Sequence, residues 1–161
     1  VNDLSIGEIN QVIAETKQSD KEKIGTSADS SSAILVFLIT ALVTAALPIY
    51  LFTSPMFNLD LAQNATYFGV ATVVAAACLT VSYSTAAKSE QLRLSKAREG
   101  STVVEASAWA LFYINALYLS LFMLFAFYLI PKIDGVPAFV TYTVSTAVPA
   151  VVLAAFQSGI F

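Results

Sequence analysis

The side chains that could do chemistry in this chain are few. The 161 residues include no histidine and a single cysteine, Cys78, which lies within an apolar run. Serine and threonine are plentiful, but a hydroxyl nucleophile needs a base beside it, and without histidine that base would have to be a lysine or a carboxylate. Metal sites need clustered histidine, cysteine or carboxylate ligands, and no such cluster occurs. The sequence therefore predicts a protein that is not an enzyme and that has no metal site and no cofactor.

The only concentration of charge after the N-terminal tail is the insert 88–105, KSEQLRLSKAREGSTVVE. Its cations suit a contact with phosphates, but Glu90, Glu99 and Glu105 leave it a net charge of only +1. If every cation met a phosphate, the log–log salt slope of binding would be roughly −3 to −4, which describes a weak auxiliary contact. The alternative is that the cations only fix the topology of the chain at the membrane surface. The candidate contact residues are Lys88, Arg93, Lys96 and Arg98.

The rest of the chain is almost free of charge, and this determines the elements that position the insert. The chain is 57% hydrophobic and 12% charged, whereas soluble domains carry about 25% charged residues. Four uncharged runs each exceed the ~20 residues that cross ~30 Å of hydrocarbon as a helix. A soluble bundle would need polar faces on its outer helices. The sequence predicts an all-α polytopic membrane protein with four transmembrane helices, at about 33–53, 62–87, 106–130 and 137–156.

Outside these spans the sequence predicts two further elements. Residues 1–32 form a polar tail in which Ser5 and Glu8 have capping-box spacing, so a short amphipathic helix is expected from about Ile6 to Thr16. The insert is expected to form a short helical hairpin between the second and third spans, with the second span continuing as helix through Leu94 and breaking near Gly100. The membrane domain is then 33–161.

Two features inside the spans predict helix packing. The second span carries small residues at a spacing of three to four, which lets helix backbones approach closely in lipid. The third span is aromatic and contains the most polar side chain well inside any span, an asparagine that should bond to a partner helix or a nearby carbonyl, a contact worth about 0.6 to 2 kcal/mol. Pro48 and Pro149 are expected to kink or interrupt the first and fourth spans. The candidate packing residues are Ala65, Gly69, Thr72, Ala76 and Asn115.

The distribution of cations predicts the orientation. Four spans place both termini and the insert on one side, which carries Lys17, Lys21, Lys23 and the four cations of the insert, whereas the other side carries Lys132 alone. Short loops follow the positive-inside rule. The termini and the insert are therefore predicted to face the cytosol.

Short motifs in order along the four spans resemble the gamma subunit of the translocon-associated protein complex. The first span opens at Ser32-Ala33 and closes on Leu47-Pro48-Ile49-Tyr50, and Leu59-Asp60-Leu61-Ala62-Gln63 leads into the second. The third begins Glu105-Ala106-Ser107-Ala108-Trp109 and continues Phe112-Tyr113-Ile114-Asn115, similar to E-A-T-T-F and F-Y-N-N in the family. The chain ends on Gln157-Ser158-Gly159, near the terminal S-T-G of that family.

The resemblance implies an endoplasmic reticulum membrane protein beside the Sec translocon and the ribosome. Its partners would be the alpha, beta and delta subunits, the Sec translocon, membrane lipids and, through the insert, ribosomal RNA or protein. It would assist the translocation and insertion of secretory chains. One departure stands out: the family has a long, strongly basic hairpin between spans two and three, and here only residues 88–105 occupy that place.

Two other functions remain open at this point. A small transporter or channel subunit could line a pore with the hydroxyls of Thr40, Thr44 and Thr72 and use the two span prolines as gates. The absence of ionisable groups well inside the spans argues against ion or proton transport. A structural subunit of another membrane complex is the third possibility, and cellular localisation would separate it from the first.

Overall fold

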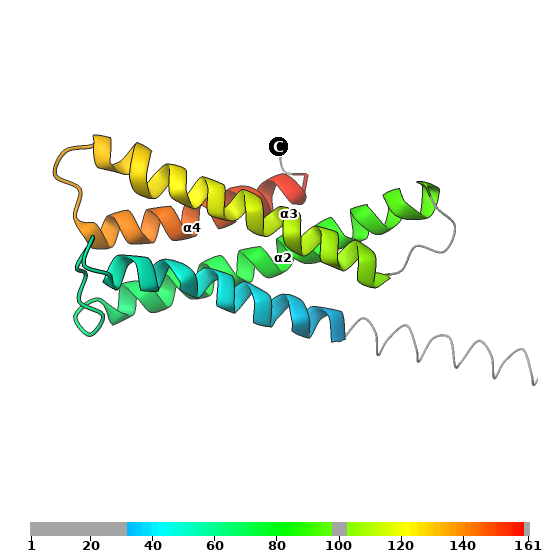
Figure 1. Cartoon of the computed structure of the whole chain (residues 1–161), viewed down its shortest axis with the longest axis horizontal. Helices are drawn as coiled ribbons and strands as arrows, with labels where there is room; N and C mark the ends of the chain where they lie inside the picture. Colours follow the sequence, from blue (N-terminus) through cyan, green and yellow to red (C-terminus); the bar gives the residue numbers. More distant parts are fainter. Residues whose placement is uncertain (1–31, 98–102, 160–161) are drawn as a thin grey trace, which may run out of the picture. The chain divides into compact units, whose positions relative to one another are not determined.

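The computed structural model of the protein describes residues 32–97 and 103–159. Within these residues all regular structure is helical, and four helices are long and apolar enough to cross a membrane, which confirms the predicted fold class (Figure 1). In chain order they are the first helix, Ser32–Thr53; α2, Ala65–Ala97; α3, Val103–Met123, which continues as a π-helical turn, Leu124–Leu129, and a 3-10 turn, Ile130–Lys132; and α4, Ala138–Gln157.

The chain divides into two compact units, Val1–Leu35 and Val36–Phe161. Of the first unit, only the helical residues from Ser32 onward belong to the described part of the chain. The expected amphipathic helix at Ile6–Thr16 and the expected break near Gly100 both lie outside the described residues. The contacts reported below all belong to the second unit.

The connection between the first helix and α2 determines where α2 begins. The Asp60 side chain accepts hydrogen bonds from the backbone N–H groups of Ala62 (2.7 Å) and Gln63 (3.1 Å). These bonds hold the chain in a turn, because an aspartate that bonds the backbone two residues on competes with a regular helix. Asn58 adds a left-handed residue, with φ of 48°. The helix therefore starts at Ala65, three residues later than the predicted span.

α2 is much longer than a membrane crossing requires. Its 33 residues correspond to about 50 Å of helix, against ~30 Å of hydrocarbon. The predicted continuation of helix through Leu94 is confirmed, since α2 runs to Ala97. No glycine or proline lies between Val70 and Ala97 to interrupt it. α2 is therefore about 20 Å longer than that core is thick, and we call its last turns, 88–97, its projecting end.

The third span is not one uniform helix. After Met123 the backbone widens into a π-helical turn, in which the N–H of Ile130 bonds the carbonyl of Phe125 five residues earlier. Pro131 then falls in the 3-10 turn and Gly135 adopts φ of 79° in the following loop. The wider turn lets Phe122, Ala126 and Ile130 all face the interior at a spacing of four.

Neither span proline ends its helix. Pro48 is buried, and the first helix continues beyond it to Thr53, whose hydroxyl donates to the Ile49 carbonyl at 2.9 Å. Pro149 is also buried, and α4 continues through it to Gln157. In a membrane bundle, neighbouring helices and hydroxyl side chains can accommodate the backbone groups that a proline leaves unpaired. The expectation that Pro149 interrupts the fourth span is therefore wrong.

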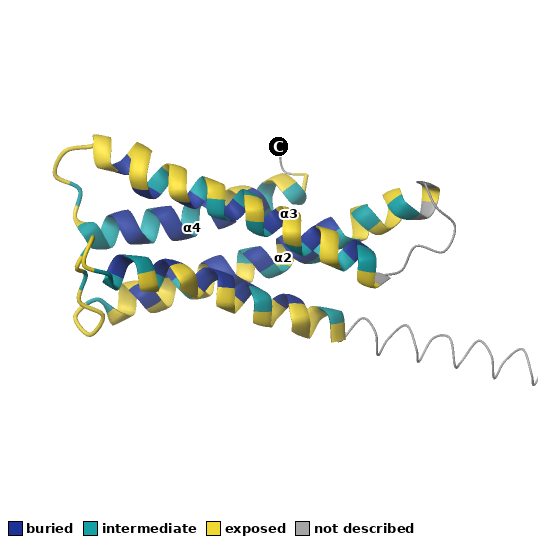
Figure 2. Cartoon of the chain, in the orientation of Figure 1, coloured by how far each residue is buried: buried dark blue, intermediate teal, exposed yellow. Residues whose placement is uncertain are grey.

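Burial in the bundle is the reverse of that in a soluble protein (Figure 2). The outer surface carries large apolar side chains such as Val73 (64% exposed) and Phe112 (69% exposed). The interior is built mainly of alanine, hydroxyl residues and a few aromatic rings. This pattern follows from the solvent, because lipid is as apolar as leucine and helices associate through close packing and hydrogen bonds instead. The buried hydroxyl residues of the described chain are Thr44, Ser82, Tyr83, Tyr118, Thr141, Tyr142, Ser145 and Thr146.

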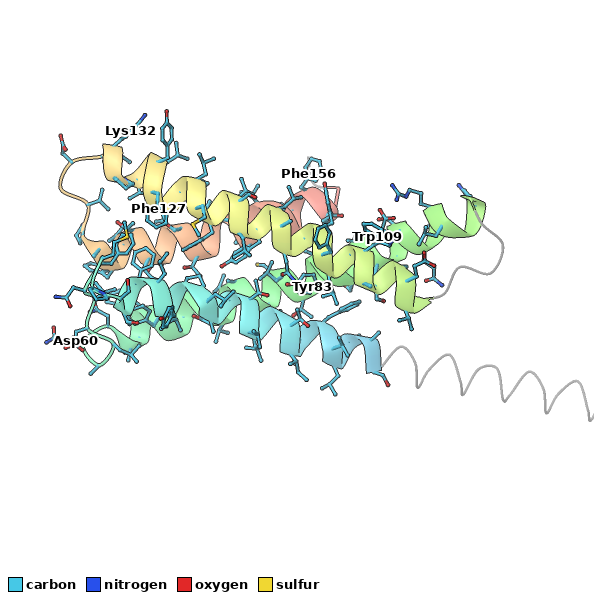
Figure 3. The ribbon with its side chains drawn as sticks, viewed as in Figure 1. Asp60, Tyr83, Trp109, Phe127, Lys132 and Phe156 are labelled. Carbon is cyan, nitrogen blue, oxygen red and sulfur yellow. The ribbon has the colours of Figure 1, made fainter. Side chains whose placement is uncertain are left out.

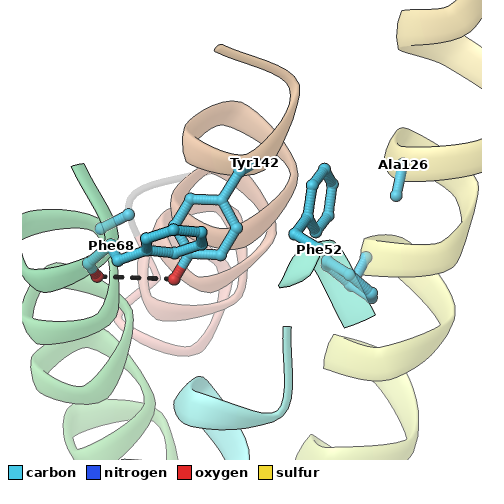
Figure 4. Close-up of a cluster of buried hydrophobic side chains, with 6 residues drawn as sticks. Phe52, Phe68, Ala126 and Tyr142 are labelled. Atoms are coloured by element: carbon cyan, nitrogen blue, oxygen red, sulfur yellow. Dashed lines mark hydrogen bonds between the residues drawn. The ribbon is translucent and has the colours of Figure 1, made fainter. Parts of the chain in front are cut away.

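One aromatic cluster joins all four helices (Figure 4). The Phe52 ring, from the first helix, meets Tyr142 of α4 edge-on at 5.3 Å and Phe122 of α3 at 6.4 Å between ring centroids. Phe68 of α2 packs against the other side of Tyr142 at 4.5 Å. The Tyr142 hydroxyl donates to the Phe68 carbonyl at 3.4 Å, so the cluster also fixes the rotation of α4 against α2.

Candidate interaction surfaces

Asn115, the polar residue singled out in the third span, connects three helices. Its side-chain oxygen accepts one hydrogen bond from the Thr44 hydroxyl of the first helix (3.2 Å) and one from the Tyr83 hydroxyl of α2 (2.5 Å). Tyr83 is fully buried and lies beside Phe37, with 6.0 Å between ring centroids (Figure 3). Asn115 therefore bonds within the chain. Its partners are two hydroxyls and not the backbone carbonyl that the sequence also allowed.

A second polar contact ties α2 to α4. The hydroxyls of Thr72 and Tyr142 lie 2.9 Å apart, and the Tyr118 hydroxyl of α3 donates to the Thr146 carbonyl of α4 at 3.4 Å. The buried hydroxyl of Ser145 lies on the same helix. Thr44 and Thr72, two of the three hydroxyls considered as pore lining, are thus engaged in contacts between helices.

The predicted small-residue face of α2 is only partly the face that packs within the chain. Ala76 is buried and Thr72 is half-buried, as expected of packing residues. Ala65 and Gly69, however, lie on the exposed side, and a side-chain carbon added at Gly69 would meet no atom within 4 Å. The closely packed face of α2 runs instead through Phe68, Ala71, Ala75, Ala76, Leu79, Ser82, Tyr83 and Ala86. Any packing at Ala65 and Gly69 stays a prediction about a partner.

The projecting end of α2 carries three of the four candidate contact cations. Lys88 and Lys96 are exposed and lie eight residues apart, which is a little over two turns along the helix and about 80° around it. Arg93 is exposed but forms an ion pair with Glu90, with 3.1 Å between Nε and Oε2. A surface pair of this kind is worth little in stability, yet it offsets the charge of Arg93. Arg98 lies outside the described residues.

The opposite end of the bundle carries one cation. The Lys132 ammonium lies over the Tyr128 ring, 3.7 Å from its centroid, and Asp60 lies at the same end (Figure 3). Phe127 of the π-helical turn packs against Phe57, with 5.7 Å between ring centroids. A lysine and a tyrosine together are typical of the interface between bilayer and water. The two ends of the bundle thus differ in charge, as the sequence predicted.

No cluster of three or more potential metal ligands occurs among residues 32–97 and 103–159. The described side chains therefore offer hydrogen bonds, apolar packing and cationic contact. Each of these is a means of binding a neighbour.

Comparison with protein families identifies a matching family. The sequence profile described as "Translocon-associated protein, gamma subunit (TRAP-gamma)" matches residues 20–106 and 94–159. The two matched segments overlap over residues 94–106, and together they include all four membrane helices. A comparison with curated protein sequences finds no match. The resemblance found in the span motifs is thereby confirmed.

Proposed function

The chain belongs to the translocon-associated protein gamma-subunit family, and on that premise we propose that it is a non-enzymatic accessory subunit of the endoplasmic reticulum translocon. It would stand beside the alpha, beta and delta subunits and the Sec translocon, and assist co-translational translocation and insertion of secretory chains. The four apolar helices, with polar contacts inside and large apolar side chains outside, suit a subunit held in the bilayer by its spans.

The orientation that this role requires follows from the cations. With the insert in the cytosol, Lys88, Arg93 and Lys96 face the ribosome side, while Lys132 and Asp134 face the lumen. Both termini then lie in the cytosol.

The observation that carries the ribosome contact is the projecting end of α2. Counted from Ala65, Lys88 lies about 35 Å along the helix and Lys96 about 47 Å, at 1.5 Å per residue. A hydrocarbon core of ~30 Å therefore leaves Lys88 at the headgroup level and Lys96 about 12 Å farther out. Among the described cations, Lys96 and Arg93 are the best placed to meet ribosomal RNA or protein, whereas Lys88 can also meet lipid phosphates.

The strength of this contact is limited by charge. The insert has four cations and three carboxylates, and Glu90 already pairs with Arg93. A short, nearly balanced insert adds binding energy mainly when the spans hold it close to the ribosome, because a tethered contact benefits from a high effective concentration. The membrane assembly, more than the insert, would keep the protein in its complex.

The test is co-sedimentation with ribosomes. A variant with glutamate in place of all four cations (Lys88, Arg93, Lys96 and Arg98) should be recovered with ribosomes less efficiently than the parent. The slope of log binding constant against log salt concentration should become shallower by roughly 3 to 4 at most. The matched control is Lys132→Glu at the other end of the bundle, which should sediment like the parent. Unchanged sedimentation of the fourfold variant would mean that the cations only set topology, and would leave the membrane role untouched.

The transporter or channel alternative predicts a different result. Thr44 and Thr72 hydrogen-bond to Asn115 and Tyr142, so they are used in helix packing and do not favour a conducting path. Solute flux through liposomes that contain the purified chain is the direct measurement, and no flux above that of empty liposomes is expected.

A further inference from the structure

The exposed side of α3 near the insert has the form of a socket for another helix. Glu105, Ala108, Trp109 and Phe112 line an open hollow of about 340 Å³. Their spacing of i, i+3, i+4 and i+7 is that of the four residues that form a hole in knobs-into-holes packing. Ala108 supplies the floor, and the exposed Trp109 and Phe112 rings, 6.3 Å apart edge-to-face, form a wall. We call these four residues the α3 socket.

Asn115 stands along the same side of α3, one turn beyond Phe112. Its oxygen is used twice within the chain, by Thr44 and Tyr83. Among the described residues its amide nitrogen donates no hydrogen bond, and this nitrogen is not one of the enclosed side-chain atoms that lack a partner. The half-buried side chain thus presents an amide donor at the surface of the bundle.

The position of this donor deep in the membrane makes it unfavourable to leave the amide unpaired. Asn115 lies ten residues from Glu105, or about 15 Å along the helix, near the middle of a ~30 Å hydrocarbon core. Acyl chains offer no acceptor there, and an unpaired polar group in hydrocarbon is unfavourable by several kcal/mol at most and by about 1 kcal/mol in measured membrane helices. A neighbouring helix that carries an acceptor at that depth would remove the cost.

We propose that the α3 socket and Asn115 together form the docking face for one membrane-spanning helix of a partner subunit. The partner helix inserts a side chain between Trp109 and Phe112 above Ala108, and presents a side-chain oxygen or an accessible carbonyl to the Asn115 amide two turns deeper. An acyl chain can cover the apolar rings of the α3 socket, but it offers no acceptor to the Asn115 amide at that depth. This inference rests on the proposed function, since it identifies where another translocon-associated subunit binds.

A photo-crosslinking residue placed at position 108 tests the occupant directly in native membranes. The expected product is a crosslink to one other membrane protein of the complex. The matched control is the same residue at Val151, an exposed position on α4, which should give less of that product. A product with lipid alone, or with a second copy of this chain, would overturn the inference.

Two substitutions test the contacts, with partner recovery in mild detergent as the readout. Ala108→Trp fills the socket from an exposed position and should lower recovery of the partner about tenfold, whereas Val73→Trp on the exposed side of α2 should leave it within about twofold. Asn115→Leu should lower recovery about three- to fifteenfold. Thr44→Val, which removes one internal donor and keeps the Asn115 amide, should not.

The melting temperature of each purified variant separates docking from folding. Ala108→Trp should melt like the parent, so a loss of recovery would then report the contact itself. If the parent chain recovers translocon-associated subunits and Ala108→Trp recovers them equally well, the docking face is refuted while the proposed function stands. If the parent chain recovers no such subunit, both are refuted.

Discussion

At the scale of single residues, Asn115 joins three helices through its side-chain oxygen. Two hydroxyls from two other helices, those of Thr44 and Tyr83, depend on its oxygen. In hydrocarbon these hydroxyls have no water molecule with which to form a hydrogen bond instead. Hydrogen bonds between membrane helices nevertheless average only about 0.6 kcal/mol, with a maximum near 1.7, because the separated helices also find partners. The two hydrogen bonds to Asn115 should therefore stabilise the folded chain, but only modestly.

Asn115→Leu removes both acceptor contacts at once. We expect the free energy of unfolding in detergent micelles to fall by about 1 to 2 kcal/mol, as measured by titration with a denaturing detergent. Tyr113→Phe is the matched control, because its ring is about half exposed, at 52%, and its hydroxyl has no described hydrogen bond. Equal stability of the two variants would show that the hydrogen bonds of Asn115 contribute nothing measurable.

At the scale of elements, α2 shows that the packing face of a helix in lipid is hard to identify from its sequence. Alanine occurs on both sides of it, exposed at Ala65 and buried at Ala71 and Ala75. In water the inner face would stand out by hydrophobic period. In lipid both faces are apolar, so composition does not distinguish them.

The two faces of α2 should respond oppositely to added bulk. Ala75→Leu forces three more carbon atoms into a fully buried position and should destabilise the bundle by about 1 to 3 kcal/mol. Gly69→Ala meets open space and removes a flexible residue from a helix, which should be neutral or stabilise the isolated chain by up to about 1 kcal/mol. Melting of the purified variants in detergent measures both effects. A large loss for Gly69→Ala would contradict the exposed position of that residue.

The number and approximate limits of the spans could be predicted from the sequence, because charge is excluded from hydrocarbon. Their exact ends could not. The turn at Asp60 depends on bonds to Ala62 and Gln63, and the third helix changes to a π-helical turn after Met123. Asn115 was recognisable by its polarity alone. Its partners were not, since Thr44 and Tyr83 lie 71 and 32 residues away in sequence and resemble many other hydroxyl residues of the chain.

At the scale of the whole molecule, the two ends of the bundle differ in what they can meet. One end continues into the cationic turns of α2, and the other closes in short loops with Lys132, Asp134 and Asp60. This asymmetry is the physical basis of the proposed orientation, since basic loops are retained in the cytosol.

Cysteine labelling in sealed microsomes measures the orientation. On a Cys78→Ala background, Lys96→Cys should react with a membrane-impermeant reagent in intact vesicles, and Asp134→Cys should react only after the vesicles are permeabilised. Both positions are exposed, so access to the reagent depends on the side of the membrane. Labelling of residue 134 in intact vesicles would reverse the proposed topology.

The unbroken length of α2 has a mechanical consequence. α2 contains one glycine, Gly69, close to its start. Because no glycine or proline follows from Val70 to Ala97, the helix resists bending there, so its projecting turns and its membrane turns move together as one rod. A ribosome that displaced Lys96 sideways would tilt the inner part of α2 in the opposite direction, with the headgroup region as the fulcrum. That tilt would press on Tyr142 through Phe68 and Thr72. The insert would then act as the short arm of a lever whose long arm is the packed interior of the bundle.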